Sequence, residues 1–327
     1  MMTDQQNSVG KDDPKWQKDV LSKLLFSTLE EQKRSRFWSN LFKSIFAGYI
    51  LVTMIMFLVA MLSSDGSREH IPAGEHTALI EINGIISADA EASADNIVTA
   101  LRKAFENDDV KGLILRINSP GGSPVQAGYI NDEIQRLKKL NPDMRVYAVI
   151  TDLCASGGYY IAAAADEIYA DKASVVGSIG VVMNGFGFVD AMNKLGVERR
   201  LYTAGENKGF LDPFSPQKKG EIEHVNGLLL SIHQQFIDVV KAGRGDKLKD
   251  DKRLFSGLVW TGEEAIKLGL VDAIGSSSHV AREVFKAEDI VDYTTRPSYL
   301  EQLADRFGVA AASTLAASLQ GNNISLR

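Results

Sequence analysis

An uncharged apolar run near the N-terminus limits what this chain can fold into more than any other feature. Residues 44–64, SIFAGYILVTMIMFLVAMLSS, contain no charged side chain, and as a helix they would be about 30 Å long, which matches the core of a bilayer. Four cations come shortly before the run: Lys33, Arg34, Arg36 and Lys43. This excess of positive charge predicts a cytoplasmic N-terminus and a C-terminal body on the outer side of the membrane.

A cleaved signal peptide and a buried core helix are the alternatives, and both fit the run less well. A signal peptide would start earlier and would have an apolar core of about 7–15 residues, and a core helix would have a polar face. We therefore predict an uncleaved single-pass anchor in the inner membrane over 44–64. Before it we expect a polar tail over 1–43 with a short helix near 15–35, and after it a linker over 65–75.

The body, residues 76–290, alternates apolar strand patterns with amphipathic helix patterns. We predict strands over 76–86, 110–120 and 145–155, helices over 93–107, 125–140 and 156–165, and two short strands within 167–182. This alternation predicts an α/β domain with a parallel sheet, in which ligands bind beyond the carboxyl ends of the strands. Residues 291–327 fit no pattern, and we expect either a flexible tail or a segment that docks into a neighbouring subunit.

Charge and cysteine content exclude several classes of protein. The net charge of −6 argues against nucleic-acid binding. The single cysteine, Cys154, excludes an intrachain disulfide and a Cys₄ zinc site. The five histidines show no metal-ligand spacing. We therefore expect no metal and no cofactor.

Two glycine pairs come directly after predicted strands and suggest acyl transfer. Gly121 and Gly122 follow the second strand, and Ser156 with Gly157 follows the third. Acyl transfer needs a nucleophile and two donors that meet the developing oxyanion. Gly157 can offer its N–H at a helix start, and Gly121 or Gly122 can offer the second. Each motif alone is also a common turn, so the prediction depends on their occurring together.

A serine nucleophile also needs a group that accepts its proton. The histidines are all predicted to be surface, loop or core-edge residues: His70, His76, His224, His233 and His279. Lys208 lies among apolar residues in the loop 203–216, and a lysine in surroundings that exclude water can act as a base. Ser215 and Lys218 match the SxxK pattern of penicillin-binding enzymes, but Ser215 followed by proline is better explained as a helix start.

Four stretches resemble a known family over residues 76–290: NSPGGS, ASGGYYIAAAADEIYAD, GSIGVV and GLVWTGEEAIKLGLVDAIG. They are similar to peptidase family S49, the signal peptide peptidases, in its short single-repeat bacterial form. The resemblance implies a ClpP/crotonase-like fold in which Ser156 is the nucleophile, Lys208 is the general base and Ser178 orients the lysine. It also implies oxyanion donors at Gly157 and at Gly121 or Gly122. The family often has Tyr-Lys-Ser around the base, where this chain has Asn207, Lys208 and Gly209.

The prediction is a membrane-anchored serine endopeptidase with a Ser–Lys dyad. We expect it to cleave remnant signal peptides or other short hydrophobic peptides on the outer side of the membrane. The resemblance also implies a homo-oligomer, a tetramer or an octamer. Two alternatives stay open: a crotonase-like acyl-CoA enzyme, and a non-catalytic scaffold with the same fold.

Overall fold

The chain divides into two units, Met1–His70 and Ile71–Arg327. The computed structural model describes residues 14–63 and 74–296. In the first unit, α1 (Pro14–Ser63) is one continuous helix, where the sequence predicted a helix near 15–35 and a separate anchor over 44–64. Residues Arg36–Val59 have a mean hydropathy of 2.0, and by length and composition this part of α1 can cross a membrane. The predicted linker falls mostly outside the described residues.

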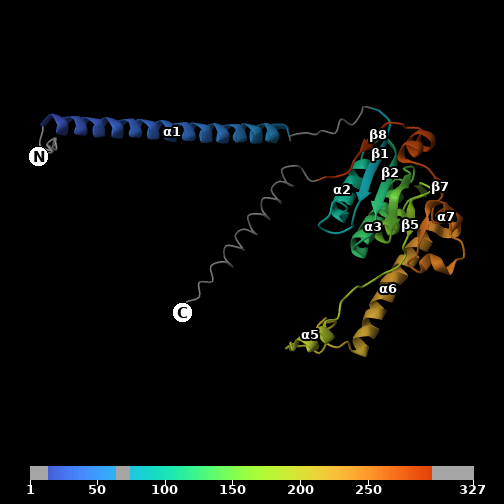
Figure 1. The fold of residues 1–327 in the computed structure, drawn as a ribbon. Helices are drawn as coiled ribbons and strands as arrows, with labels where there is room; N and C mark the ends of the chain where they lie inside the picture. Colours follow the sequence, from blue (N-terminus) through green and yellow to red (C-terminus); the bar gives the residue numbers. More distant parts are fainter. Residues whose placement is uncertain (1–13, 64–73, 297–327) are drawn as a thin grey trace, which may run out of the picture. The chain divides into compact units, whose positions relative to one another are not determined.

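A mostly parallel sheet forms the centre of the second unit (Figure 1). Its strands, as described, are β1 (His76–Asn83), β2 (Val110–Ser119), β3 (Val146–Ala155), β4 (Glu167–Ala170), β5 (Val175–Gly177), β6 (Val259–Thr261), β7 (Ala273–Ile274) and β8 (Ile290–Asp292). The order is β6-β5-β3-β2-β1-β8, and β4 lies between β3 and β7. Among these strands, only the β5–β6 pair is antiparallel. The predicted α/β class with a parallel sheet is confirmed.

Helices connect the parallel strands and begin at residues that suit helix starts. The described helices of this unit are α2 (Ala94–Phe105), α3 (Pro124–Leu140), α4 (Gly157–Ala162), α5 (Val189–Leu195), α6 (Lys219–Arg244), α7 (Gly262–Lys267), α8 (Ser277–His279), η1 (Gly245–Lys247), η2 (Lys252–Phe255) and η3 (Val280–Phe285). Ser93 accepts a hydrogen bond from the N–H of Asn96 at the start of α2, and Ser123 accepts one from the N–H of Gln126 at the start of α3. These caps satisfy N–H groups that have no partner within the helix.

The strands alternate their side chains between two apolar clusters, one on each face of the sheet. Ala78, Ile80 and Ile82 of β1 belong to the larger cluster, with buried residues of α2 and α3. Leu79 belongs to the smaller cluster, in which Phe285 of η3 also packs. Both faces of the central strands are therefore covered, as is typical of parallel sheets.

The sheet extends slightly past the boundary predicted at residue 290. β8 pairs with β1 from Ile290 to Asp292. The N–H of Thr77 donates to the carbonyl of Asp289 at 2.8 Å, and the N–H of Tyr293 donates to that of Leu79 at 2.8 Å. The last strand of the sheet thus lies at the start of the predicted C-terminal extension. Residues 297–327, the rest of that extension, lie outside the described residues.

Residues 180–226 leave the sheet and form a projecting arm, which the sequence did not predict (Figure 1). An extended segment leads to α5, and a loop returns to the first turns of α6. Two contacts join these parts of the arm: the N–H of Phe188 donates to the carbonyl of Pro213 at 2.8 Å, and the rings of Phe188 and Phe214 stack with centroids 5.4 Å apart. The arm exposes large apolar side chains, among them Phe186 at 82% and Leu195 at 77%.

Candidate active site

Ser156 occupies a strained turn between β3 and α4. Its φ of 52° and ψ of −120° are a backbone conformation that residues with a side chain rarely adopt. The N–H of Ser156 donates to the carbonyl of Gly177 at 2.9 Å, and its own carbonyl accepts from the N–H of Tyr160 at 3.0 Å. The turn is therefore held from both sides, and the serine stands at the carboxyl end of a parallel strand, where the sequence predicted a site.

The glycine pair of the neighbouring loop lies directly against this turn. A Cβ on Gly121 would lie 2.7 Å from the nitrogen of Gly157, and one on Gly122 would lie 2.1 Å from the carbonyl oxygen of Ile86. Both glycines also have a positive φ, 97° and 154°. A side chain on Gly121 would therefore push its loop away from the serine turn, and one on Gly122 would collide with the backbone of Ile86.

The two glycines differ in what their N–H groups do. The N–H of Gly121 donates to the hydroxyl of Ser119, which is buried. The N–H groups of Gly122 and Gly157 have no acceptor among the described residues. A Cβ on Gly157 would lie 3.3 Å from the nitrogen of Gly122, so the two backbones are close together. Two open N–H donors thus stand beside Ser156, as an oxyanion site requires.

A cavity of about 670 Å³, here called the serine pocket, opens beside Ser156. Its apolar lining comes from α4, α6 and the start of the arm: Tyr160, Val181, Val182, Ile232 and Phe236. The rings of Tyr160 and Phe236 lie 5.2 Å apart. The sequence analysis missed these residues, although the i, i+4 spacing of Ile232 and Phe236 could have indicated one face of α6.

Ser178 lines the same pocket as Ser156 and is also strained. Its φ is 53°, and its N–H donates to the carbonyl of Leu258 at 2.7 Å. Gly177, which accepts the hydrogen bond from Ser156, directly precedes it. The structure therefore brings together four of the predicted site residues, Ser156, Gly157, Gly122 and Ser178, with Gly121 directly behind them.

Lys208 does not lie in the serine pocket of its own chain. It is exposed on the arm, where its N–H donates to the carbonyl of Gly205 at 3.1 Å. The same loop contacts α6 through the rings of Phe210 and His224, 5.6 Å apart. The first residue of α6 that lines the serine pocket is Ile232, which lies about two turns, or about 12 Å along the helix axis, beyond His224. A single chain therefore does not form the Ser–Lys pair, and the dyad stays a prediction.

No lysine, histidine or carboxylate among the described residues lines the serine pocket. His76 is buried beside Tyr293, His224 packs on Phe210, and His233 lies 3.3 Å from the carbonyl of Ile179. His279 lies near Tyr169, outside the pocket, and His70 lies outside the described residues. The described part of the chain also holds no cluster of three or more metal-ligating side chains.

Cys154 is close to Ser156 in sequence but is not a second nucleophile. Its side chain is fully buried, and burial raises the pKa of the Cys154 thiol. A thiol that stays protonated in apolar surroundings is inert.

Fold and site together define an α/β protein of the ClpP-like class, with a strained serine at a strand end beside two open N–H groups. The sequence model of Peptidase family S49 matches residues 138–291. A putative signal peptide peptidase SppA from Enterococcus faecium is 32% identical over 241 residues, which are 71% of this chain and 68% of that protein. Protease 4 from Haemophilus influenzae is 34% identical over 235 residues, 68% of this chain and 36% of that protein. This chain belongs to peptidase family S49, and the resemblance found in its sequence is confirmed.

Another protein that is similar to this chain is named as an antiporter and not as a peptidase. The Na(+)/H(+) antiporter NhaA of Brucella abortus is 49% identical over 185 residues, which are 57% of this chain and 25% of the antiporter. The chain thus spans about a quarter of the length of that relative. The antiporter name belongs to a protein that is mostly outside the match.

Proposed function

We propose that this chain is a membrane-anchored serine endopeptidase that cleaves remnant signal peptides or other short hydrophobic peptides. The observation that carries the proposal is the position of Ser156, strained at a strand end beside the open N–H groups of Gly157 and Gly122. The apolar lining of the serine pocket suits apolar substrate side chains. Relatives named signal peptide peptidase and protease support this reading.

In the proposed mechanism, the hydroxyl of Ser156 attacks the scissile carbonyl carbon. Lys208, as a neutral amine, accepts the hydroxyl proton and then gives it to the leaving amine. The N–H groups of Gly157 and Gly122 stabilise the oxyanion. We favour Gly122 over Gly121, because the N–H of Gly121 is already engaged by Ser119. Water then attacks the acyl-enzyme. Lys208 accepts a proton from this water and returns a proton to the oxygen of Ser156 as the acyl group leaves.

Lys208 reaches Ser156 only from a second copy of the chain in this proposal. Lys208 is exposed on an arm that points away from its own serine pocket, and the arm exposes Leu195 and Tyr202, which line neither the serine pocket nor any other cavity described below. An arm that packs on a neighbouring copy would bury these side chains and exclude water around the amine, as a lysine base requires. Ser178 would then orient the incoming amine. A closed ring of four or eight copies, the predicted tetramer or octamer, would give every serine a lysine.

The anchor places the catalytic body beside a substrate that is itself left in the membrane. α1 contains the stretch Arg36–Val59, which is long and apolar enough to cross. Lys33 and Arg34 precede this stretch, and Arg36 and Lys43 lie in its N-terminal part. We therefore propose an N-terminus in the cytoplasm and a catalytic domain on the outer side of the cytoplasmic membrane.

Mixing two inactive variants tests both the dyad and its sharing between copies. Ser156→Ala and Lys208→Ala should each abolish hydrolysis of an apolar peptide, whereas Lys194→Ala, another exposed lysine of the arm, should not. When the two inactive variants are co-assembled in equal amounts, random pairing should restore about a quarter of the wild-type activity. Activity in either single variant would reject the dyad, and no recovery on mixing would reject a shared site.

A further inference from the structure

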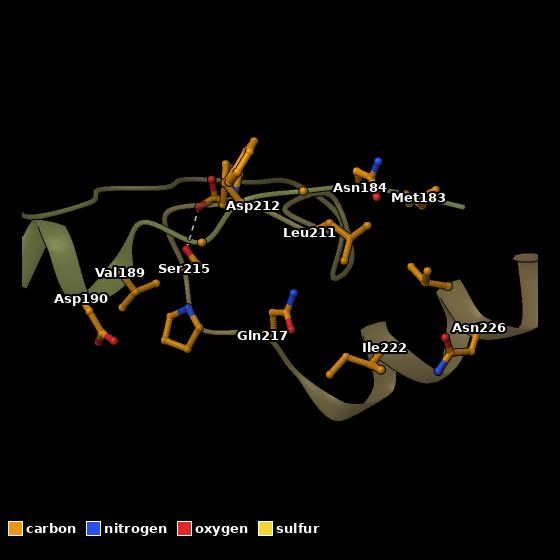
Figure 2. A pocket seen from close by; sticks show the side chains of 16 residues that line it. Met183, Asn184, Val189, Asp190, Leu211, Asp212, Ser215, Gln217, Ile222 and Asn226 are labelled. Atoms are coloured by element: carbon orange, nitrogen blue, oxygen red, sulfur yellow. Dashed lines mark hydrogen bonds between the residues drawn. The ribbon is translucent and has the colours of Figure 1, made fainter. Parts of the chain in front are cut away.

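A second cavity lies on the arm and is connected to the serine pocket by one segment of chain. This arm pocket has a volume of about 580 Å³. Its apolar lining consists of Met183, Phe186, Val189, Leu211, Ile222 and Val225. Figure 2 shows Leu211 from the returning loop and Ile222 from α6 on opposite sides of the pocket, with Met183 and Asn184 on the extended segment at its edge. The mechanism above uses none of these residues.

The extended segment 180–187 contributes to both pockets. Gly180, Val181 and Val182 line the serine pocket, and residues 183–187 line the arm pocket. No residue of the segment has a positive φ, and none makes a backbone hydrogen bond to another described residue. The backbone N–H and C=O groups of this segment therefore have no backbone partner among the described residues, and an extended peptide can pair with such groups.

The exposure of side chains along this segment shows what kind of peptide would fit. Val182 is 76% exposed and Phe186 is 82% exposed. Both are apolar, and they stand beside the two pockets. A paired peptide with apolar side chains would cover both, and burial of apolar surface is the main source of binding energy.

We propose that the arm pocket is a second binding site for the same peptide that is cut at Ser156. It takes an apolar side chain four or five residues from the one in the serine pocket, because Val182 and Phe186 are about 13 Å apart along an extended chain. This inference rests on the proposed function, since it takes the serine pocket as the place of cleavage. Among the short hydrophobic peptides proposed above, the substrate is then an extended apolar peptide of at least about six residues that fills both pockets.

Binding to the Ser156→Ala protein tests the site without any need for cleavage. The probes are a fluorescent ten-residue leucine-rich peptide with a terminal lysine and a four-residue peptide of the same kind. The full-length Ser156→Ala protein in detergent should bind the longer peptide about tenfold more weakly when Ile222→Ser is added. The four-residue peptide should bind equally well to both proteins. The matched control is Leu230→Ser, which makes the same change at an exposed position of α6 that lines neither pocket.

Three results would overturn the inference. Ile222→Ser could leave the binding of the longer peptide unchanged. An aspartate scan of that peptide could show one sensitive position instead of two that are four or five residues apart. Sedimentation could show that Ile222→Ser dissociates the assembly and weakens both peptides equally, in which case the pocket holds a second copy of the chain. Failure of the wild-type protein to cleave any peptide would instead reject the proposed function, and these binding results would stand apart from it.

Discussion

Ser156 has a backbone conformation that favours glycine, although the proposed mechanism requires its hydroxyl. Its φ of 52° and ψ of −120° lie outside the regions that residues with a Cβ prefer. Strain of this kind costs on the order of 1–3 kcal/mol and persists only where the surroundings hold it. The hydrogen bonds to Gly177 and from Tyr160 hold it here. The protein therefore keeps a less stable residue at a position that lines the serine pocket.

Two substitutions at Ser156 should differ in stability by the amount of this strain. The free energy of unfolding of the Ser156→Gly variant should be about 1 kcal/mol higher than that of the Ser156→Ala variant, since glycine tolerates positive φ. Urea unfolding followed by circular dichroism measures the difference, and both variants should be inactive.

Ser278 is the matched control for this comparison. It lies in α8, exposed and without a positive φ. There the order should reverse, with Ser278→Gly about 0.5–1 kcal/mol less stable than Ser278→Ala. Equal stability of the two Ser156 variants would show that the turn is not strained.

At the scale of elements, a charged clamp joins α2 to α3. Glu133 of α3 accepts hydrogen bonds at 2.7 Å from Arg136 of the same helix and at 2.7 Å from Arg102 of α2. Its side chain is only 9% exposed. The hydrogen bond from Arg136 has the largest effect on its pKa, burial opposes it, and Arg102 adds to it, so that the pKa falls to about 2.

This lowered pKa predicts a pH window for the clamp. A carboxylate with a pKa of about 2 in the folded state and its ordinary value of 4.5 when unfolded stabilises the fold above pH 4.5. The contribution is lost as the pH falls from about 4.5 to 2. Glu133→Gln should therefore cost about 1 kcal/mol at pH 7, because both arginine partners are half exposed, and nearly nothing near pH 2. Urea unfolding at the two pH values checks this, and a pH-independent cost would contradict the role of the charge.

A second clamp fixes the end of α6, the helix that carries Ile232 and Phe236. The buried side chain of Arg244 donates to the carbonyl of Gly269 at 3.0 Å and to Asp272 at 2.8 Å. Burial by itself would raise the pKa of Asp272, but hydrogen bonds from Arg244 and Lys247 outweigh it and hold the pKa below its usual value. A partly buried ion pair therefore joins the end of α6 to Asp272, the residue directly before β7.

Removal of this arginine should be costly. Arg244→Met should lower the free energy of unfolding by about 3 kcal/mol, because it leaves a partly buried carboxylate without its main partner. Arg282→Met is the control, since Arg282 is half exposed and pairs only with its neighbour Glu283, and it should change stability by less than about 0.5 kcal/mol. Comparable urea midpoints for the two variants would contradict the clamp.

The elements that could be predicted are those whose signals are local. α2 begins after Ser93 and β3 ends at Ala155, as expected, because a capping serine and an apolar run bounded by glycines act within a few residues. The three-residue strand β8 was not predicted, because it exists only through its pairing with β1. The arm was not predicted either, since its extended segment has no regular period and makes no backbone hydrogen bond to another described residue.

The same distinction applies to the candidate site. Ser156, Gly157 and the pair Gly121 and Gly122 could be predicted to lie together because they follow two parallel strands, which end at one edge of the sheet. The preference for Gly122 over Gly121 needed the structure, which shows the bond from Gly121 to Ser119. The position of Lys208 depends on how the arm folds and on what it contacts, which no local pattern specifies.

At the scale of the whole molecule, the two units should be separable. The second unit starts at Ile71, and its first contacts within the described residues are the ion pair of Glu75 with Lys111 and the hydrogen bonds of His76. The ring of His76 bridges the carbonyl of Gly74 and the hydroxyl of Tyr293, each at 2.9 Å. Thr77 adds bonds to Ala287 and Asp289. These contacts join the start of β1 to the end of the sheet, so the point of truncation matters.

A chain that starts at Gly74 should be soluble without detergent and should unfold cooperatively, because it keeps every contact of His76 and Thr77. The full chain should stay with membranes through a carbonate wash, because transfer of the apolar stretch Arg36–Val59 to water is unfavourable.

A chain that starts at Leu79 is the matched control for the chain that starts at Gly74. It loses the bonds that hold β8 and the buried His76, and it should be at least about 3 kcal/mol less stable or fail to fold. Release of the full chain by carbonate would contradict the anchor, and equal stability of the two truncated chains would show that β8 contributes little to the sheet.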